Sequence, residues 1–178
     1  DAKGPMALNI PRLSIPAGRY VVNYPLQLID GGIEGMISGK DISTVLIMDR
    51  RHWMGSEPRL LELMSTKGTV NINGRIRVSG LALEVEDDDG LSTGVWIDRP
   101  NVEVDMQRMS FKGFAGQGVC LAEAGNCRLT DVKFRGNSTC IALLGCSGPD
   151  LVFSHVAAVD NGTLFHVGPW GNKIGRAH

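Results

Sequence analysis

A pattern of alternating apolar residues repeats four times in the second half of the chain, and it restricts the fold more than any other feature. In each copy, two apolar residues at alternate positions are followed by a two-residue interruption and then by two more. The copies are Ile76/Val78/Leu81/Leu83, Val104/Met106/Met109/Phe111, Cys127/Leu129/Val132/Phe134 and Leu151/Phe153/Val156/Ala158. Their starts, at 76, 104, 127 and 151, are 28, 23 and 24 residues apart. Repeats of this length are typical of solenoids.

A shorter apolar segment accompanies each copy at a matching offset. These segments are Val95–Ile97, Val119–Leu121, Ile141–Leu143 and Phe165–Val167. Each coil of the solenoid therefore holds three short strands, none of which can bury its apolar face alone. Stacking one coil on the next completes the hydrogen bonding and buries a continuous interior. The repeat predicts an all-β fold of stacked parallel coils.

The sequence resembles the pectate-lyase-like, right-handed parallel β-helix superfamily, which includes phage tailspikes and polysaccharide lyases. Besides the repeat, the resemblance rests on Ile15–Val22 with Pro25–Leu28 as the opening strands, and on Ile33–Gly39 and Thr44–Ile47 as a first irregular coil. It spans residues 8 to 168. It implies about four to five coils in a single domain at 1–178, with irregular coils at 8–74, regular coils at 75–168 and a tail at 169–178. We interpret the chain as a fragment of a longer protein.

The resemblance gives the two-residue interruption a structural meaning, as the tight bend between the second and third strands of a coil. Its second position is Gly80, Arg108, Asp131 and His155 in successive copies. Gly, Asp and His tolerate a left-handed backbone better than most residues, so a geometric role for Asp131 and His155 is favoured over a catalytic one. The segment 56–64 fits either a short helix or a strand, and the coil pattern favours a strand.

Composition excludes several classes of protein. With 43% apolar residues and a net charge of -1, the 178-residue chain is neither disordered nor built like a nucleic-acid binder. No apolar run approaches the length of about 20 residues that crosses a membrane. The four cysteines lack the spacing of a zinc site, and buried thiols are favoured over a disulfide. Asn137 and Asn161 match the N-glycosylation pattern, which matters only in a protein secreted by a eukaryote.

Candidate ligand-binding residues lie on the first strand of each coil and in the loop before it. The outward positions of that strand are expected to be Trp96, Cys120, Ala142 and His166. An outward tryptophan on a rigid sheet is a platform for the apolar face of a sugar ring; alternatively, a loop or a partner chain covers Trp96. The remaining candidates for ligand binding are Arg99 and the acidic run Asp87, Asp88 and Asp89.

We predict no cofactor, with Ca²⁺ at Asp87–Asp89 as the one alternative. Clustered carboxylate oxygens suit this cation, and the resemblance includes calcium-dependent lyases. However, the run lacks the loop pattern of a known calcium motif, and runs of like charge are usually solvated turns.

The candidate catalytic residues are Asp98 and His166. Hydrolysis would require a carboxylate pair, for which Asp98 and the Asp87–Asp89 run are the only candidates near one groove. Lysis or epimerisation would require a base such as His166, with Arg99 or Arg128 as the cation. The signatures of polygalacturonases and of alginate epimerases are both absent.

These observations favour a polysaccharide-recognising module of a spike or appendage, similar to a phage tailspike. For such a module we expect a homotrimer at an extracellular or virion surface, with polysaccharide rather than nucleic acid as its partner and no membrane span. The alternative is an enzyme acting on uronic-acid polymers as a lyase, hydrolase or epimerase. Under either hypothesis, the coils that carry the function can lie beyond residue 178.

Overall fold

The fold was analysed in a computed structural model, which describes residues 7–8, 12–29, 31–38, 41–64, 74–86, 90–99, 102–124, 126–144 and 151–168. Its strands are β1 Ala7–Leu8, β2 Leu13–Ser14, β3 Gly18–Val22, β4 Leu26–Ile29, β5 Gly31–Glu34, β6 Ile37–Ser38, β7 Asp41–Ile42, β8 Thr44–Asp49, β9 Arg59–Met64, β10 Gly74–Ser79, β11 Leu81–Glu86, β12 Thr93–Arg99, β13 Val102–Lys112, β14 Gln117–Ala124, β15 Cys127–Arg135, β16 Thr139–Leu143, β17 Leu151–Val159 and β18 Thr163–Val167. No helix occurs within these ranges.

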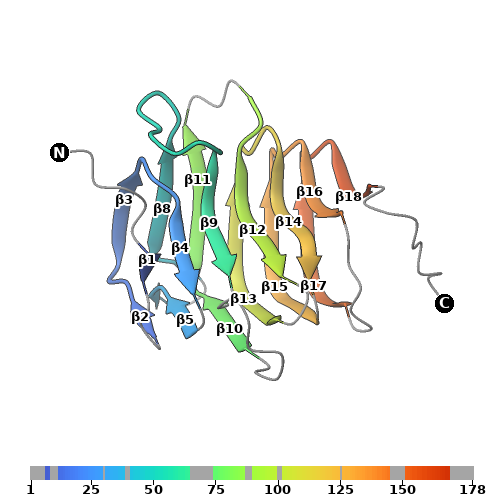
Figure 1. Ribbon diagram of the computed structural model, residues 1–178, viewed down its shortest axis with the longest axis horizontal. Helices are drawn as coiled ribbons and strands as arrows, with labels where there is room; N and C mark the ends of the chain where they lie inside the picture. Colours follow the sequence, from blue (N-terminus) through green and yellow to red (C-terminus); the bar gives the residue numbers. More distant parts are fainter. Residues whose placement is uncertain are drawn as a thin grey trace.

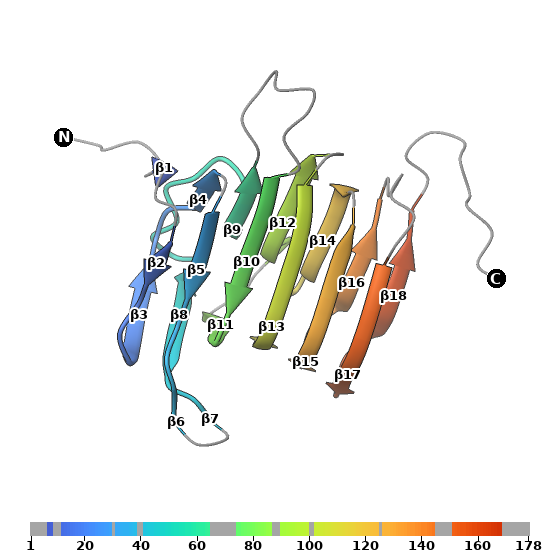
Figure 2. The ribbon, with the colours of Figure 1, turned by 90° about the horizontal axis from the view of Figure 1, so that it is seen from below.

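The strands form two large sheets that face each other across one core (Figures 1 and 2). The seven-stranded sheet has the order β1-β4-β9-β12-β14-β16-β18. The nine-stranded sheet has the order β2-β5-β10-β13-β11-β8-β3, and β15 and β17 extend it beyond β13. Every strand pair in both sheets is parallel, while the small β6–β7 hairpin is antiparallel. The protein is therefore a parallel β-solenoid of about five coils, as the repeat predicts.

The interior is filled by columns of apolar side chains, one from each coil. Val95, Val119 and Ile141 are neighbours in the register of the seven-stranded sheet, and all three are fully buried. Phe111 and Phe134 are partners in the other sheet, and their rings stack with centroids 5.0 Å apart. The alternating positions read from the sequence are thus the core positions. Apolar side chains at equivalent positions pack against one another from coil to coil and fill the interior.

The predicted bend between the second and third strands is confirmed. Its residues have left-handed φ values of 68° at Gly80, 51° at Arg108, 55° at Asp131 and 53° at His155. At Gly80 only glycine fits, because an added Cβ would lie 2.7 Å from the carbonyl oxygen of Gly35. In β13, β15 and β17 the two strand segments run on through the bend as one continuous strand.

Two other predictions concern the N-terminal half and the segment 56–64. The strand interpretation of 56–64 is confirmed by β9, which begins at Arg59 after a loop. The N-terminal coils already stack on the regular ones, because β5 and β8 pair with β10 and β11, and β9 pairs with β12. The β6–β7 hairpin is an irregular insertion between β5 and β8.

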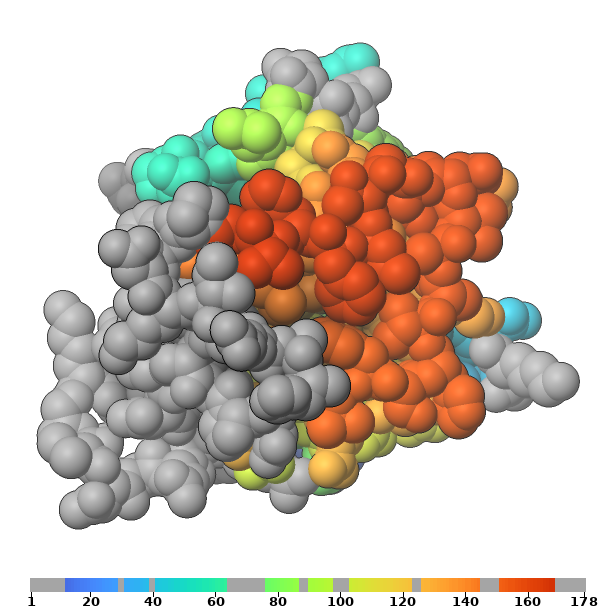
Figure 3. All heavy atoms as spheres, turned by 90° about the vertical axis from the view of Figure 1, so that its right-hand side faces the viewer, coloured from blue at the N-terminus to red at the C-terminus, as the bar shows by residue number. Residues whose placement is uncertain are grey.

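The last coil has no neighbour among the described residues on its outer side (Figure 3). Positions that are buried in inner coils become more exposed here: Phe165 follows the fully buried Ile141 in register and is 41% exposed, and Val167 follows the partly buried Leu143 and is 70% exposed. β17 and β18 are also edge strands. The apolar interior therefore comes to the surface at this end of the solenoid.

Candidate functional site

The outward face of the seven-stranded sheet carries one file of side chains in register. The file consists of Gln27, Glu62, Trp96, Cys120, Ala142 and His166. The sequence predicted the last four members as neighbours, and the register aligns them. Cys120 and Ala142 are nevertheless buried, so the accessible part of the file lies at its two ends.

Trp96 lies at the centre of a polar cluster at the N-terminal end of this file. The guanidinium carbon of Arg59 lies 3.7 Å from the centroid of its ring, a cation–π contact. Arg59 Nη1 is also 3.5 Å from Glu62 Oε1, and Gln27 Nε2 donates a hydrogen bond of 2.8 Å to Glu62 Oε2. Arg59 therefore already covers part of the ring face that the sequence suggested for sugar stacking.

The indole nitrogen of Trp96 is buried, and no hydrogen-bond acceptor for it lies in the described part of the chain. A buried donor without a partner costs about 1 to 3 kcal/mol relative to one that is satisfied. The Trp96 side chain is thus held by its ring contact with Arg59, while its indole nitrogen is buried away from solvent.

A cavity of about 160 Å³ adjoins this cluster and shares Gln27 and Glu62 with it. The loop before β9 supplies Met54 and Glu57, and Tyr24 comes from the turn between β3 and β4. The Tyr24 hydroxyl lies 3.1 Å from Met54 Sδ. The cavity therefore combines two carboxylates, an amide and a phenol, a set that can donate to and accept from hydroxyl groups.

Sequence reasoning missed Gln27, Arg59 and Glu62 as partners of Trp96. The coil containing β9 is longer than the later ones, since Leu61 pairs with Val95, 34 positions away, whereas Val95 pairs with Val119, 24 away. The regular spacing therefore cannot be extended back to β9. The one available signal was Glu62, a charged residue among the apolar residues of 60–63.

The two predicted catalytic residues lie on different strands of the same sheet. Asp98 is in β12 and His166 is in β18, and β14 and β16 run between them. Three steps of about 4.8 Å place the two strands roughly 14 Å apart, and Asp98 lies two residues beyond Trp96, the residue in register with His166. His166 is exposed and has no hydrogen bond or ion pair with any residue the structure describes. This arrangement does not place the two residues beside the same substrate bond.

The other predicted site residues divide into three groups. The side chains of Asp98 and Arg99 are not described, although their backbone lies in β12. The run Asp87–Asp89 lies outside the described residues, so calcium binding there stays a prediction. Arg128 lies on β15 of the nine-stranded sheet, in register with Asp105, and therefore cannot serve as the cation beside His166.

Asp131 and His155 are neighbours at the left-handed bends, with Asp131 Oδ1 3.2 Å from His155 Nδ1. Both side chains are exposed and no cavity adjoins the pair among those found. Their backbone conformation accounts for their position, in agreement with the geometric interpretation.

The cysteines Cys120, Cys127 and Cys140 are buried, while Cys146 lies outside the described residues. Burial raises the pKa of the Cys140 thiol to about 11, which keeps it protonated at neutral pH. Over the described ranges no group of three or more His, Cys, Asp or Glu residues could hold a metal ion. No helix there is long and apolar enough to cross a membrane.

Comparisons of the chain with protein-family models, with curated proteins and with solved structures found no match. By its fold, the chain belongs to the parallel β-solenoids.

Proposed function

We propose that the chain is a polysaccharide-recognising module of a spike or appendage protein, related to the pectate-lyase-like β-helices and tailspikes that its sequence resembles. The observation that supports this most is the cluster of Trp96, Arg59, Glu62 and Gln27 beside a polar cavity on a rigid sheet. An aromatic ring for apolar sugar faces, next to side chains that hydrogen-bond hydroxyl groups, is what carbohydrate recognition requires.

Each member of the cluster has a distinct role in the proposal. Glu62 and Gln27 accept hydrogen bonds from sugar hydroxyls or donate to them, and the ring of Trp96 contacts the apolar face of the sugar. Arg59 holds the ring of Trp96 and shares the charge of Glu62. Because all four side chains come from parallel strands or their starts, the site is formed before the ligand arrives, which lowers the entropic cost of binding.

The module acts in this proposal as a homotrimer at an extracellular or virion surface, where polysaccharide is encountered. Outward apolar side chains such as the exposed Met54 favour contact with another subunit or with ligand. The molar mass measured by light scattering tests the trimer, which predicts three times the monomer mass.

Retention on immobilised polysaccharides, combined with analysis of released products, tests the function. The expected result is retention without cleavage, weakened about tenfold by Trp96→Ala, which removes the ring, and by Glu62→Gln, which keeps the shape of the side chain. Lys133→Ala, an exposed change on the other sheet, is the matched control and should bind as the wild-type protein does.

Each alternative outcome has a definite meaning. Release of shortened products with unsaturated uronic ends would replace the binding proposal with the enzyme hypothesis. Retention that is unchanged in both Trp96→Ala and Glu62→Gln would place the ligand elsewhere on the solenoid. Equal thermal unfolding of Glu62→Gln and wild-type protein ensures that lost retention is not lost folding.

A further inference from the structure

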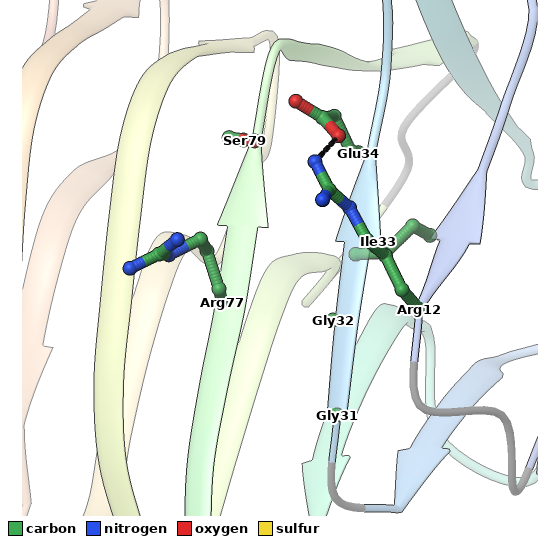
Figure 4. Close-up of a pocket in the computed structure, with 7 residues that line it drawn as sticks. All are labelled: Arg12, Gly31, Gly32, Ile33, Glu34, Arg77 and Ser79. Atoms are coloured by element: carbon green, nitrogen blue, oxygen red, sulfur yellow. Dashed lines mark hydrogen bonds and ion pairs between the residues drawn. The ribbon is translucent and has the colours of Figure 1, made fainter.

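A second cavity, of about 290 Å³, lies on the outward face of the nine-stranded sheet (Figure 4). It is lined by Arg12, Gly31, Gly32, Ile33, Glu34, Arg77 and Ser79. These residues come from β5, β10 and the start of β2, on the opposite sheet from Trp96. The volume is near the lower limit of about 300 Å³ for small-molecule sites.

The cavity exists because a charged file of side chains lacks one member. Along this sheet Arg77, Asp105 and Arg128 are partners in register, so the file alternates in charge. The next position beyond Arg77 is Gly32, which has no side chain. Gly32 therefore contributes only backbone to the lining of the cavity. An added Cβ there would lie 3.2 Å from the Arg77 carbonyl oxygen.

Arg77 retains unused hydrogen-bond donors. Its nearest partner is Asp105, with Nε and Oδ2 3.6 Å apart, which is longer than a hydrogen bond. Gln107 donates hydrogen bonds of 3.1 Å to both carboxylate oxygens of Asp105, so the carboxylate has a donor besides Arg77. The Arg77 side chain is 57% exposed and extends toward β13 (Figure 4). To bind a ligand over Gly32, the guanidinium group would turn away from Asp105 about its side-chain bonds.

Ser79 supplies a further polar group for a ligand. It is 5% exposed and lines the cavity, yet its hydroxyl forms no hydrogen bond with the part of the chain that the structure describes. A hydroxyl that lines a cavity without an internal partner can hydrogen-bond to water or to a ligand there. Across the cavity, Arg12 forms an ion pair with Glu34 (Figure 4).

The chemistry of the lining defines the ligand. The lining carries two guanidinium groups and one carboxylate, and the carboxylate of Asp105 lies beside Arg77. Arginine binds a planar carboxylate through paired hydrogen bonds. Ser79 and Glu34 then remain to donate to and accept from hydroxyl groups. We propose that this cavity binds one acidic sugar residue, a monosaccharide-sized polyol carrying a carboxylate, with Arg77 on the carboxylate and Ser79 on a hydroxyl. The site is separate from the Trp96 cluster and does not depend on the function proposed for that cluster.

Calorimetric titration with glucuronate, with glucose as the neutral analogue and acetate as the bare carboxylate, tests the proposal. Glucuronate should bind at millimolar concentration or below and more tightly than either control compound, and binding should weaken as salt is added. Arg77→Met should weaken it about tenfold or more, since it removes a charged hydrogen-bond donor. Arg128→Met, an exposed arginine in the same file outside the cavity, should leave the affinity unchanged.

Ser79→Ala keeps every charge in place and should weaken glucuronate binding several-fold. It therefore keeps the test decisive if Arg77→Met fails to fold. The proposal is overturned if the wild-type protein does not bind glucuronate, if glucose or acetate binds equally well, or if Ser79→Ala and a folded Arg77→Met both bind normally. Polymer retention through Trp96 is a separate measurement, so either proposal can fail without the other.

Discussion

At the scale of single residues, the side chain of Asn137 links three coils by hydrogen bonds. Its Oδ1 accepts from the backbone N–H of Phe114, and its Nδ2 donates to the Phe111 carbonyl and to Asn161 Oδ1, at 3.1, 3.1 and 2.9 Å. Asn137 is 2% exposed. The amide nitrogen is therefore inaccessible for glycosylation in the folded chain, although the sequence motif is present.

Asn137→Ala should lower the free energy of unfolding by about 2 to 3 kcal/mol, because it leaves the Phe114 N–H and the Phe111 carbonyl buried without these partners. Urea denaturation followed by circular dichroism measures the change. Ser138→Ala, at the exposed neighbouring position, should stay within about 0.5 kcal/mol of the wild-type value. Equal denaturation midpoints for the two variants would contradict this role of Asn137.

Single residues could be predicted from the sequence where the repeat dictates their environment. The left-handed position is an example, because Gly80, Asp131 and His155 all belong to the types that tolerate that conformation. Asn137 could be placed in a turn, but its partners could not be identified, since they depend on how one coil is aligned with the next. The contact of Arg59 with Trp96 was missed for the same reason.

At the scale of strands, the interior columns make the same position fully buried in one coil and exposed in another. Ile141 in β16 and Phe165 in β18 are register partners, yet Ile141 is 0% exposed and Phe165 is 41% exposed. Phe165 contacts Phe153, with ring centroids 5.2 Å apart, but has no coil on its other side among the described residues. The contribution of a strand to stability is thus set by its place in the stack.

Ile141→Ala should cost about 2 to 4 kcal/mol, because it leaves a cavity inside the stack. Phe165→Ala should cost less than about 1.5 kcal/mol, although it deletes more atoms, because water already reaches that side chain. Chemical denaturation of the two variants provides the comparison. A larger loss for Phe165→Ala would mean that another chain or segment covers β18 in solution.

The strands themselves were largely predictable from the sequence. The alternating pattern placed the strands of the regular coils, and the need of each coil for a strand decided the assignment of β9. The candidate sites were less predictable, because each combines neighbouring strands from the irregular N-terminal coils. The cavity between β5 and β10 depends on Gly32 lying beside Arg77, 45 positions further along the chain, and no fixed period connects them.

At the scale of the whole molecule, stability should decrease from the central coils toward the C-terminal end. Among the strands that the structure describes, β14 has a neighbour on each side, whereas β18 has only β16. The backbone amides of β18 should therefore exchange with deuterium faster than those of β14, by a factor that mass spectrometry of peptides from the two strands can measure. Equal protection of the two strands would contradict an open end.

The spacing of paired residues has a consequence for how the chain folds. Where both strands of a pair come from β10 or later, the paired residues lie 22 to 28 positions apart. Contact order in this region is therefore uniform, and no pairing joins the two ends of the solenoid, so closing one coil never requires a loop longer than a single repeat. During synthesis on the ribosome, each coil can dock onto the last completed one as soon as its own residues have emerged.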